Sequence, residues 1–166
     1  MAGIDKLRNM TSVYLLCEDK VLLLFRQGSR VVNDVWTGSA GGHFEENELN
    51  DPEACVLREL EEELNITRDM IADLELRYIT LRRCGELRQN YYFFARLPHG
   101  TDMTLTSDEG TLRWFPLEQI DGLPMPFSAR FVLRHYLETG RYNHALYGGM
   151  ASGETVTFAE LTDAPR

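Results

Sequence analysis

The sequence predicts one α/β domain in which strands outnumber helices, and three observations lead to this prediction. The chain has 166 residues, the length of one ordinary domain that buries most of its apolar surface. Its composition, 43% hydrophobic and 26% charged, is typical of a folded globular protein. Most apolar runs have the length of a strand, while two segments repeat apolar residues with helical spacing. We expect a single domain over residues 1–166, with a core at about 11–140 and a C-terminal extension at about 141–166.

The N-terminal elements begin with a predicted hairpin. Two β-rich runs, 11–17 and 20–26, flank the short polar pair Glu18-Asp19. A loop is expected over 27–35. The small-residue stretch 37–42 then predicts either a close approach of the backbone to another group or a flexible turn.

The first helix is predicted from its start and stop signals. Residues 50–53 offer a capping side chain, a proline for the first helical position and an acidic residue in the first turn. The helix should end at about Leu64, with Asn65 as a left-handed cap.

The remaining elements follow in the same way. Strands are expected at 76–84, 87–97 and 111–115, with a polar loop over 99–108. A second amphipathic helix should cover 128–138 and be closed by Gly140, and two short strand-like runs surround 148–153.

Charge is distributed very unevenly along the chain. The net charge is −9, and the window from Glu45 to Glu63 holds nine acidic residues and one basic residue, Arg58, so it carries −8 of that charge. A protein that binds the nucleic-acid backbone should carry a basic face instead. This balance therefore excludes general nucleic-acid binding.

Cysteine usage and the N-terminus bear on the compartment. Cys17, Cys55 and Cys84 are scattered and odd in number, which fits neither a disulfide framework nor a zinc site. The first ten residues contain no apolar signal core, and no apolar run is long enough to span a membrane. We expect a cytoplasmic protein.

The first predicted helix separates its apolar and acidic residues. Leu57, Leu60 and Leu64 form one stripe, and the side chains of Glu59, Glu62 and Glu63 fall on another face. A charge run on a helix is usually a solvated surface. Here, however, adjacent carboxylates repel one another with few interleaved lysines, which favours a bound cation. Oxygen ligands without Cys or His select a hard cation such as Mg²⁺, Mn²⁺ or Ca²⁺.

At this segment the sequence resembles the Nudix box, G-x5-E-x7-R-E-U-x-E-E-x-G-U, where U is a bulky aliphatic residue. Gly42 and Glu48 fit its first half, and the run from Arg58 to Leu64, followed by Ile66, fits its second half. The match departs in two places: nine residues instead of seven separate Glu48 from Arg58, and Asn65 replaces the glycine. Outside the box, the order of elements from about 11 to 138 looks like the MutT-like branch.

The resemblance implies a Nudix-type α/β/α sandwich with a mixed β-sheet, and Mg²⁺-dependent cleavage of a diphosphate linked to another moiety, with Mn²⁺ as a substitute. Carried over by position, Glu59 and Glu63 are metal ligands and Glu62 is a third ligand or the base. Arg58 orients a glutamate by hydrogen bonds. The backbone around Gly42 contacts metal or phosphate.

Four further residues are candidates with open alternatives. Glu109 matches a loop glutamate that serves some relatives as base or extra ligand, or it is an ordinary surface acid. Trp36 stacks on a base or is a core tryptophan. Arg26 meets a phosphate or is simply exposed, and His43, beside the glycines, touches a phosphate.

The function implied by the resemblance is cleavage of a nucleoside triphosphate to the monophosphate and pyrophosphate, which would suit sanitation of the nucleotide pool. One alternative is hydrolysis of a nucleoside diphosphate linked to another group, such as ADP-ribose. A non-catalytic alternative is a nucleotide sensor. In each case the expected partner is a small nucleotide, without nucleic acid or membrane, and the protein is a monomer or homodimer.

Overall fold

Strands form the centre of the molecule. A computed structural model describes residues 6–27, 34–98 and 105–166. Within these ranges the strands are β1 (Leu7–Cys17), β2 (Lys20–Arg26), β3 (Val35–Thr37), β4 (Ala40–His43), β5 (Ala72–Arg83), β6 (Leu87–Arg96), β7 (Gly110–Pro116), β8 (Tyr147–Ser152) and β9 (Thr155–Glu160).

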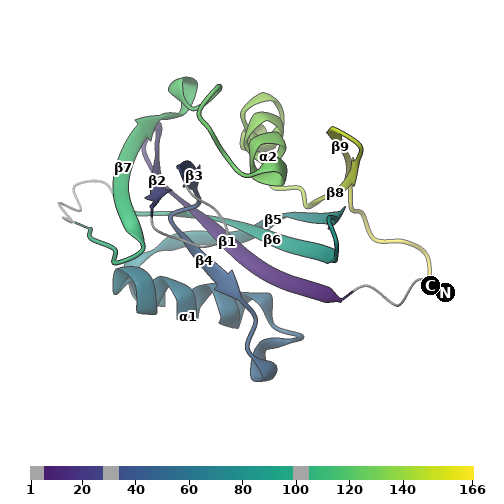
Figure 1. The fold of residues 1–166 in the computed structure, drawn as a ribbon, viewed down its shortest axis with the longest axis horizontal. Coiled ribbons are helices and arrows are strands. Elements are labelled where there is room, and N and C mark those ends of the chain that lie inside the picture. Colours follow the sequence, from purple (N-terminus) through teal and green to yellow (C-terminus); the bar gives the residue numbers. More distant parts are fainter. Residues whose placement is uncertain (1–5, 28–33, 99–104) are drawn as a thin grey trace.

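Two α-helices accompany these strands, α1 (Pro52–Leu64) and α2 (Phe127–Glu138). Short 3₁₀ turns stand at η1 (Glu46–Glu48), η2 (Arg68–Met70), η3 (Leu117–Gln119) and η4 (Gly140–Tyr142). Helix α1 lies on one face of the sheet and α2 on the other (Figure 1). The expected α/β/α sandwich is confirmed.

All nine described strands belong to one mixed sheet. Its main path runs β3-β2-β1-β6-β5-β8-β9, while β4 pairs with β1 and β7 pairs with β2. The pairs β1–β6 and β5–β8 are parallel and the others are antiparallel. Two strands pair with the same edge of β1: β4 with residues 10–13 and β2 with residues 15–17. The sheet therefore forks at β1.

The two faces of the sheet bury separate cores. Successive residues of a strand point to opposite faces. Accordingly, Val13 and Leu15 of β1 pack in the core under α1, whereas Tyr14 and Leu16 pack in the core under α2. Helix α1 contributes Val56, Leu60 and Leu64 to its core, and α2 contributes Ala129, Val132, Leu133 and Tyr136 to the other.

The helix predicted at 52–64 is confirmed together with both of its caps. The Asp51 carboxylate accepts a hydrogen bond of 3.0 Å from the backbone N–H of Ala54, and Pro52 occupies the first turn. At the other end Asn65 is left-handed, with φ 54°. Its backbone N–H donates to the carbonyl of Glu61, which closes the helix.

The other predicted elements are also present, with shifted ends. The predicted hairpin is confirmed by pairing of β1 with β2, although β1 already begins at Leu7. Strand β5 begins four residues before the predicted start at Leu76, and the second helix begins one residue early, at Phe127. Parts of the two expected loops, 28–33 and 99–104, lie outside the described residues.

Two short strands, β3 and β4, were not expected. Strand β4 consists of Ala40, two glycines and His43, a composition with low β-propensity, and it forms because β1 provides an antiparallel partner. At the C-terminus, β8 adds to the edge of β5 and β9 pairs with β8, so this hairpin continues the main sheet. Among the described residues, no helix has the length and apolar character needed to cross a membrane.

Candidate active site

The acidic face of α1 lies against β4, which supplies the glycine pair of the sequence motif. Glu59 is buried beside Gly42, and a Cβ on Gly42 would stand 2.3 Å from Glu59 Oε1. The backbone can approach this carboxylate only because residue 42 has no side chain. Of the two readings of the small-residue stretch, the close approach is the one that the structure shows.

Arg58 is the centre of a hydrogen-bond network that gathers three glutamates. Its guanidinium donates to Glu48 Oε1 at 2.6 Å and Glu48 Oε2 at 3.1 Å, a bidentate pair. It also donates to Glu59 Oε1 at 2.9 Å and Glu62 Oε2 at 3.0 Å. A further bond of 3.0 Å reaches the carbonyl of His43. Arg58 therefore fixes the orientation of Glu59 and Glu62 and ties α1 to β4.

Glu48 is held inside this network. Its side chain is 5% exposed, and the hydrogen bonds from Arg58 lower the pKa of its carboxyl to about 2. The Glu48 carboxylate also accepts from the backbone N–H of Glu45 at 3.0 Å. The two extra residues before the helix thus leave the contact between Glu48 and Arg58 intact.

Glu63 lies in a different environment on the same helix. Burial, and then the nearby charge of Glu59, raise the pKa of its carboxyl to about 7. The backbone N–H of Gly41 donates to Glu63 Oε2 at 3.4 Å, a long hydrogen bond that offsets only part of this cost. Burial also raises the pKa of Glu59. Two neighbouring carboxylates with raised pKa values are typical of a cation site without its cation.

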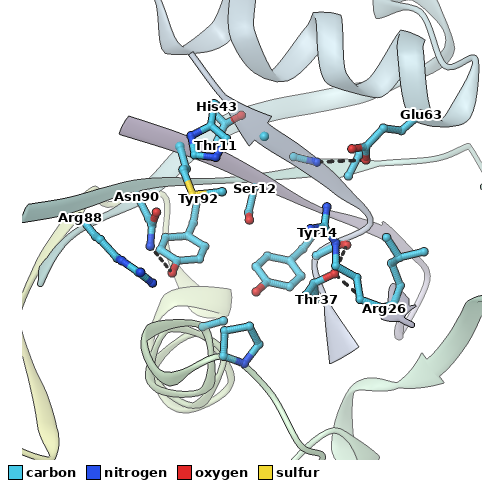
Figure 2. Close-up of a pocket in the computed structure, with 18 of the residues that line it drawn as sticks. Thr11, Ser12, Tyr14, Arg26, Thr37, His43, Glu63, Arg88, Asn90 and Tyr92 are labelled. Carbon is cyan, nitrogen blue, oxygen red and sulfur yellow. Dashed lines mark hydrogen bonds between the residues drawn. The ribbon is translucent and has the colours of Figure 1, made fainter. Parts of the chain in front are cut away.

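A cleft of about 340 Å³ opens beside Glu63 (Figure 2). It lies at the fork of the sheet, between the strands and the first turn of α2, because Gly41 of β4, Tyr14 of β1, Tyr92 of β6 and Ala129 of α2 all line it. Its polar lining comprises Arg8, Thr11, Ser12, Arg26, Thr37, His43, Arg88 and Asn90. The cleft therefore combines aromatic and polar surfaces with three guanidinium groups.

Arg26 and Glu109 meet at the side of this cleft. Arg26 Nη2 lies 4.0 Å from Glu109 Oε2, and the Glu109 side chain is 53% exposed. The charges of both residues act on the pKa of Glu63, Arg26 lowering it and Glu109 raising it. The structure thus brings Glu109 close to the acidic helix, although the two are far apart in the sequence.

His43 and Trp36 have different surroundings. His43 lines the cleft and its Nε2 lies 2.8 Å from Arg8 Nη2; burial and the charge of Arg8 lower the pKa of its ring. Trp36 does not line the cleft; its ring packs against Phe25 and Phe115, at centroid distances of 4.9 and 4.7 Å. Trp36 is partly buried and packs against the core under α2, and its stacking on a base stays a prediction.

The donor set suits a hard divalent cation. Within the described part of the chain, no group of three or more His, Cys, Asp or Glu side chains stands in a geometry that could hold a metal. Glu62 accepts from Arg58, Glu59 accepts from Arg58 and lies beside Gly42, and Glu63 accepts from the backbone N–H of Gly41. Their carboxylate oxygens are donors of the kind that Mg²⁺ or Mn²⁺ prefers.

Sequence reasoning missed most of the cleft floor. Arg88, Asn90 and Tyr92 alternate along β6 and so share one face. Arg88 and Asn90 are two of the four polar residues of β6, so their spacing alone did not single them out. Ser12 of β1 likewise follows the polar residues Arg8, Asn9 and Thr11.

A family model described as the NUDIX domain matches residues 6–139. No curated protein matches the chain.

Three solved structures are similar in fold. The mMutator MutT protein of Bacillus halodurans is 23% identical with a TM-score of 0.62, covering 92% of this chain and 97% of its own. An Ap4A hydrolase of C. elegans is 18% identical with a TM-score of 0.64, covering 82% and 99%. A MutT protein of Methanosarcina mazei Go1 is 18% identical with a TM-score of 0.65, covering 84% and 99%.

Proposed function

We propose that this chain, which belongs to the NUDIX domain family and is a Nudix hydrolase, cleaves a nucleoside triphosphate. The products are the monophosphate and pyrophosphate. The observation that carries this proposal is the position of Glu63. Its carboxylate, with a raised pKa, stands at the mouth of a cleft that is lined by aromatic rings and three arginines. Such a cleft suits a ligand with a flat base at one end and phosphates at the other.

Glu59 and Glu63 would hold the metal ion, Mg²⁺ or Mn²⁺, with Glu62 as a third ligand. When bound, the cation neutralises the phosphate oxygens and makes the phosphorus accessible to water. Arg58 keeps Glu59 and Glu62 oriented through its 2.9 and 3.0 Å hydrogen bonds. The backbone groups of Gly41 and Gly42 lie close enough to the carboxylates to contact the same metal or phosphate.

Arg26 and Glu109 complete the proposed chemistry. Arg26 lines the cleft and donates to phosphate oxygens, which stabilises the negative charge that develops there. Glu109 is the candidate that takes a proton from the attacking water, since it is exposed and paired with Arg26 beside Glu63. Glu62, the other candidate base, is held by Arg58. His43 contacts a phosphate from the side of Arg8.

A nucleoside diphosphate linked to another group is the second candidate substrate. Arg8 and Arg88 both contact Glu86, at 3.3 and 3.1 Å, and both line the cleft. Figure 2 places Arg88 on the opposite side of the cleft from Glu63. The group beyond the diphosphate, for example the terminal ribose of ADP-ribose, would accept hydrogen bonds from this pair through its hydroxyls.

The test is a chromatographic screen that resolves the nucleotide products and pyrophosphate, with Mg²⁺ over nucleoside triphosphates, ADP-ribose and dinucleoside polyphosphates, for wild type and Glu63→Gln. We expect release of pyrophosphate from a triphosphate, and a fall in turnover of about 10³-fold in the variant, as for loss of a metal ligand or base. Glu61→Gln is the matched control, because Glu61 is exposed on the same helix. Equal turnover by wild type and Glu63→Gln on every substrate would contradict the proposal.

We also propose the partner, the compartment and the oligomeric state of this enzyme. We expect a small nucleotide as its partner, without nucleic acid, because the net charge is −9 and a protein that binds the nucleic-acid backbone carries a basic face. The three cysteines are free thiols, which suits the cytoplasm. We expect a monomer or a homodimer.

A further inference from the structure

A second hollow, of about 210 Å³, lies under the other end of α2. It is lined by Leu16 of β1, Phe94 of β6 and Tyr136 of α2. Each of these residues follows a residue of the catalytic cleft on the same element. Leu16 and Phe94 come two positions after Tyr14 and Tyr92, and Tyr136 comes seven positions after Ala129. The two hollows therefore share one face of the sheet and are separated by its aromatic core.

Arg77 of β5 forms the inner wall of the second hollow and is 4% exposed. Its Nε donates to the carbonyl of Ala145 at 2.9 Å, and its Nη2 to the carbonyl of Gly140 at 2.7 Å and Asn143 Oδ1 at 3.1 Å. Among the described residues, the ion pair of Nη1 is with Glu75, at 3.9 Å. The guanidinium is thus fixed by three bonds, and its Nη1 is left without a short one.

Two more guanidinium groups gather at the same place, from β6 and η4. Arg96 and Arg141 line the hollow with Arg77. Burial raises the pKa of the Tyr136 hydroxyl, and the charges of all three arginines oppose that rise. Three cations from three separate elements therefore line one hollow together with Tyr136, whose hydroxyl is a hydrogen-bond donor.

The acidic residues of the lining only partly balance these cations. Asp73 and Glu75 line the hollow, and Glu75 Oε1 contacts His144 Nδ1 at 3.0 Å on the exposed rim. Three guanidinium groups face two carboxylates, so the lining keeps a net positive charge even with His144 neutral. The catalytic cleft does not use any of these residues.

We propose that the hollow formed by Arg77, Arg96, Arg141 and Tyr136 is a second binding site, for a phosphate-type oxyanion. Guanidinium groups pair with phosphate oxygens through parallel hydrogen bonds, and a phosphate has enough oxygens to engage several of them at once. The buried Arg77 provides a fixed donor, and the two exposed arginines close over the ligand. Binding here is independent of the proposed catalytic activity.

The experiment is an amide NMR titration of the full chain without divalent metal, with inorganic phosphate in one arm and inorganic pyrophosphate in the other. We expect saturable shifts at Asn143 and Ala145, separate from any shifts at Gly41 and Gly42 in the cleft. The two dissociation constants show whether phosphate or pyrophosphate is the better ligand. Arg96→Gln and Arg141→Gln should each weaken binding by about tenfold, as for loss of one charge-assisted hydrogen bond.

Arg134→Gln is the matched control. Arg134 is on α2 but pairs with Asp121 at 3.3 Å outside the hollow, so its loss should leave the shifts unchanged. Both arginines to be tested are exposed, so the variants should fold, and a melting curve verifies this. Shifts confined to Gly41 and Gly42, no saturable shift in either arm, or equal weakening by Arg134→Gln would each overturn the proposal.

Discussion

The glutamates of the active-site region divide into two sets that differ in how the protein treats their charge. Glu48 receives a bidentate pair from Arg58, and the pKa of its carboxyl falls to about 2. Glu63 receives one long hydrogen bond from a backbone N–H, and the pKa of its carboxyl rises to about 7. Glu59 stands between them, because it is bonded to Arg58 and yet its pKa is raised by burial.

This difference shows that carboxylates of one acidic segment can have pKa values shifted in opposite directions. Arg58 bonds to Glu48, Glu59 and Glu62 and so fixes this part of the structure, whereas Glu63 has no bond to Arg58 among the described residues and keeps a raised pKa. Four substitutions test this division, and their expected effects on stability decrease from Arg58→Gln to Glu62→Gln.

Arg58→Gln should have the largest effect. It leaves the 5%-exposed Glu48 carboxylate without its charged partner, and loss of one member of such a pair costs about 3 kcal/mol. Urea unfolding at neutral pH measures this loss. Arg68→Gln, which breaks only an exposed 3.9 Å pair with Glu53, is the control and should change stability little. Equal effects of the two substitutions would remove the distinction between the sets.

Gly42→Ala should have the next largest effect on stability. A Cβ there would stand 2.3 Å from Glu59 Oε1, so the carboxylate or β4 must move, and overpacking of this kind costs about 2 kcal/mol. Turnover with Mg²⁺ should fall as well, because Glu59 is a proposed ligand. Thermal melting and a turnover assay on the same sample measure both effects. Gly85→Ala, at a turn where an added Cβ meets nothing within 4 Å, is the control for turnover, which should not change.

Glu63→Gln should raise stability, the opposite sign, in a pH-dependent way. The folded-state pKa of about 7 lies above the usual 4.5, so the folded chain holds a proton that the unfolded chain releases between these values. The contribution of Glu63 is therefore fully present below pH 4.5 and is lost as the pH rises through 7. The variant should melt a few degrees higher than wild type at pH 8 and equally at pH 4, by calorimetry. A constant difference across this range would show that Glu63 is not perturbed.

Glu62→Gln should change stability least. Its side chain is 58% exposed, and its pair with Arg58 is an i, i+4 surface pair worth about 0.5 kcal/mol. Turnover should nevertheless fall, if Glu62 is the third ligand. A melting curve and a Mg²⁺ titration of activity separate the two roles. A large loss of stability would place Glu62 in the same set as Glu48.

The sequence predicted elements with local signals and missed those that depend on partners. Helix α1 was found because Asp51, Pro52 and Asn65 are local start and stop signals. Strand β4 was missed because its glycines have low β-propensity and its pairing with β1 comes from residues some 30 positions away in the chain.

The candidate site follows the same rule. The glutamates of α1 could be named from their spacing, since one helix presents them. The contact between Glu48 and Arg58 crosses a two-residue insertion, and only the structure shows that η1 returns Glu48 to the helix. Arg88 and Asn90 join the cleft because β6 pairs in parallel with β1, whose residues lie 80 positions earlier in the chain.

That parallel pairing also has a consequence for how the molecule folds. Its register joins Leu7 to Leu87 and Leu16 to Arg96, a separation of 80 residues along the chain. Contacts of such long range require a large loop to close first, and they slow folding relative to local elements. The backbone hydrogen bonds of helix α1 are local, and strand β4 pairs with a stretch of β1 some 30 positions away, so both can form before β6 is in place. The cleft wall that contains Arg88 and Asn90 is therefore expected to form late in folding.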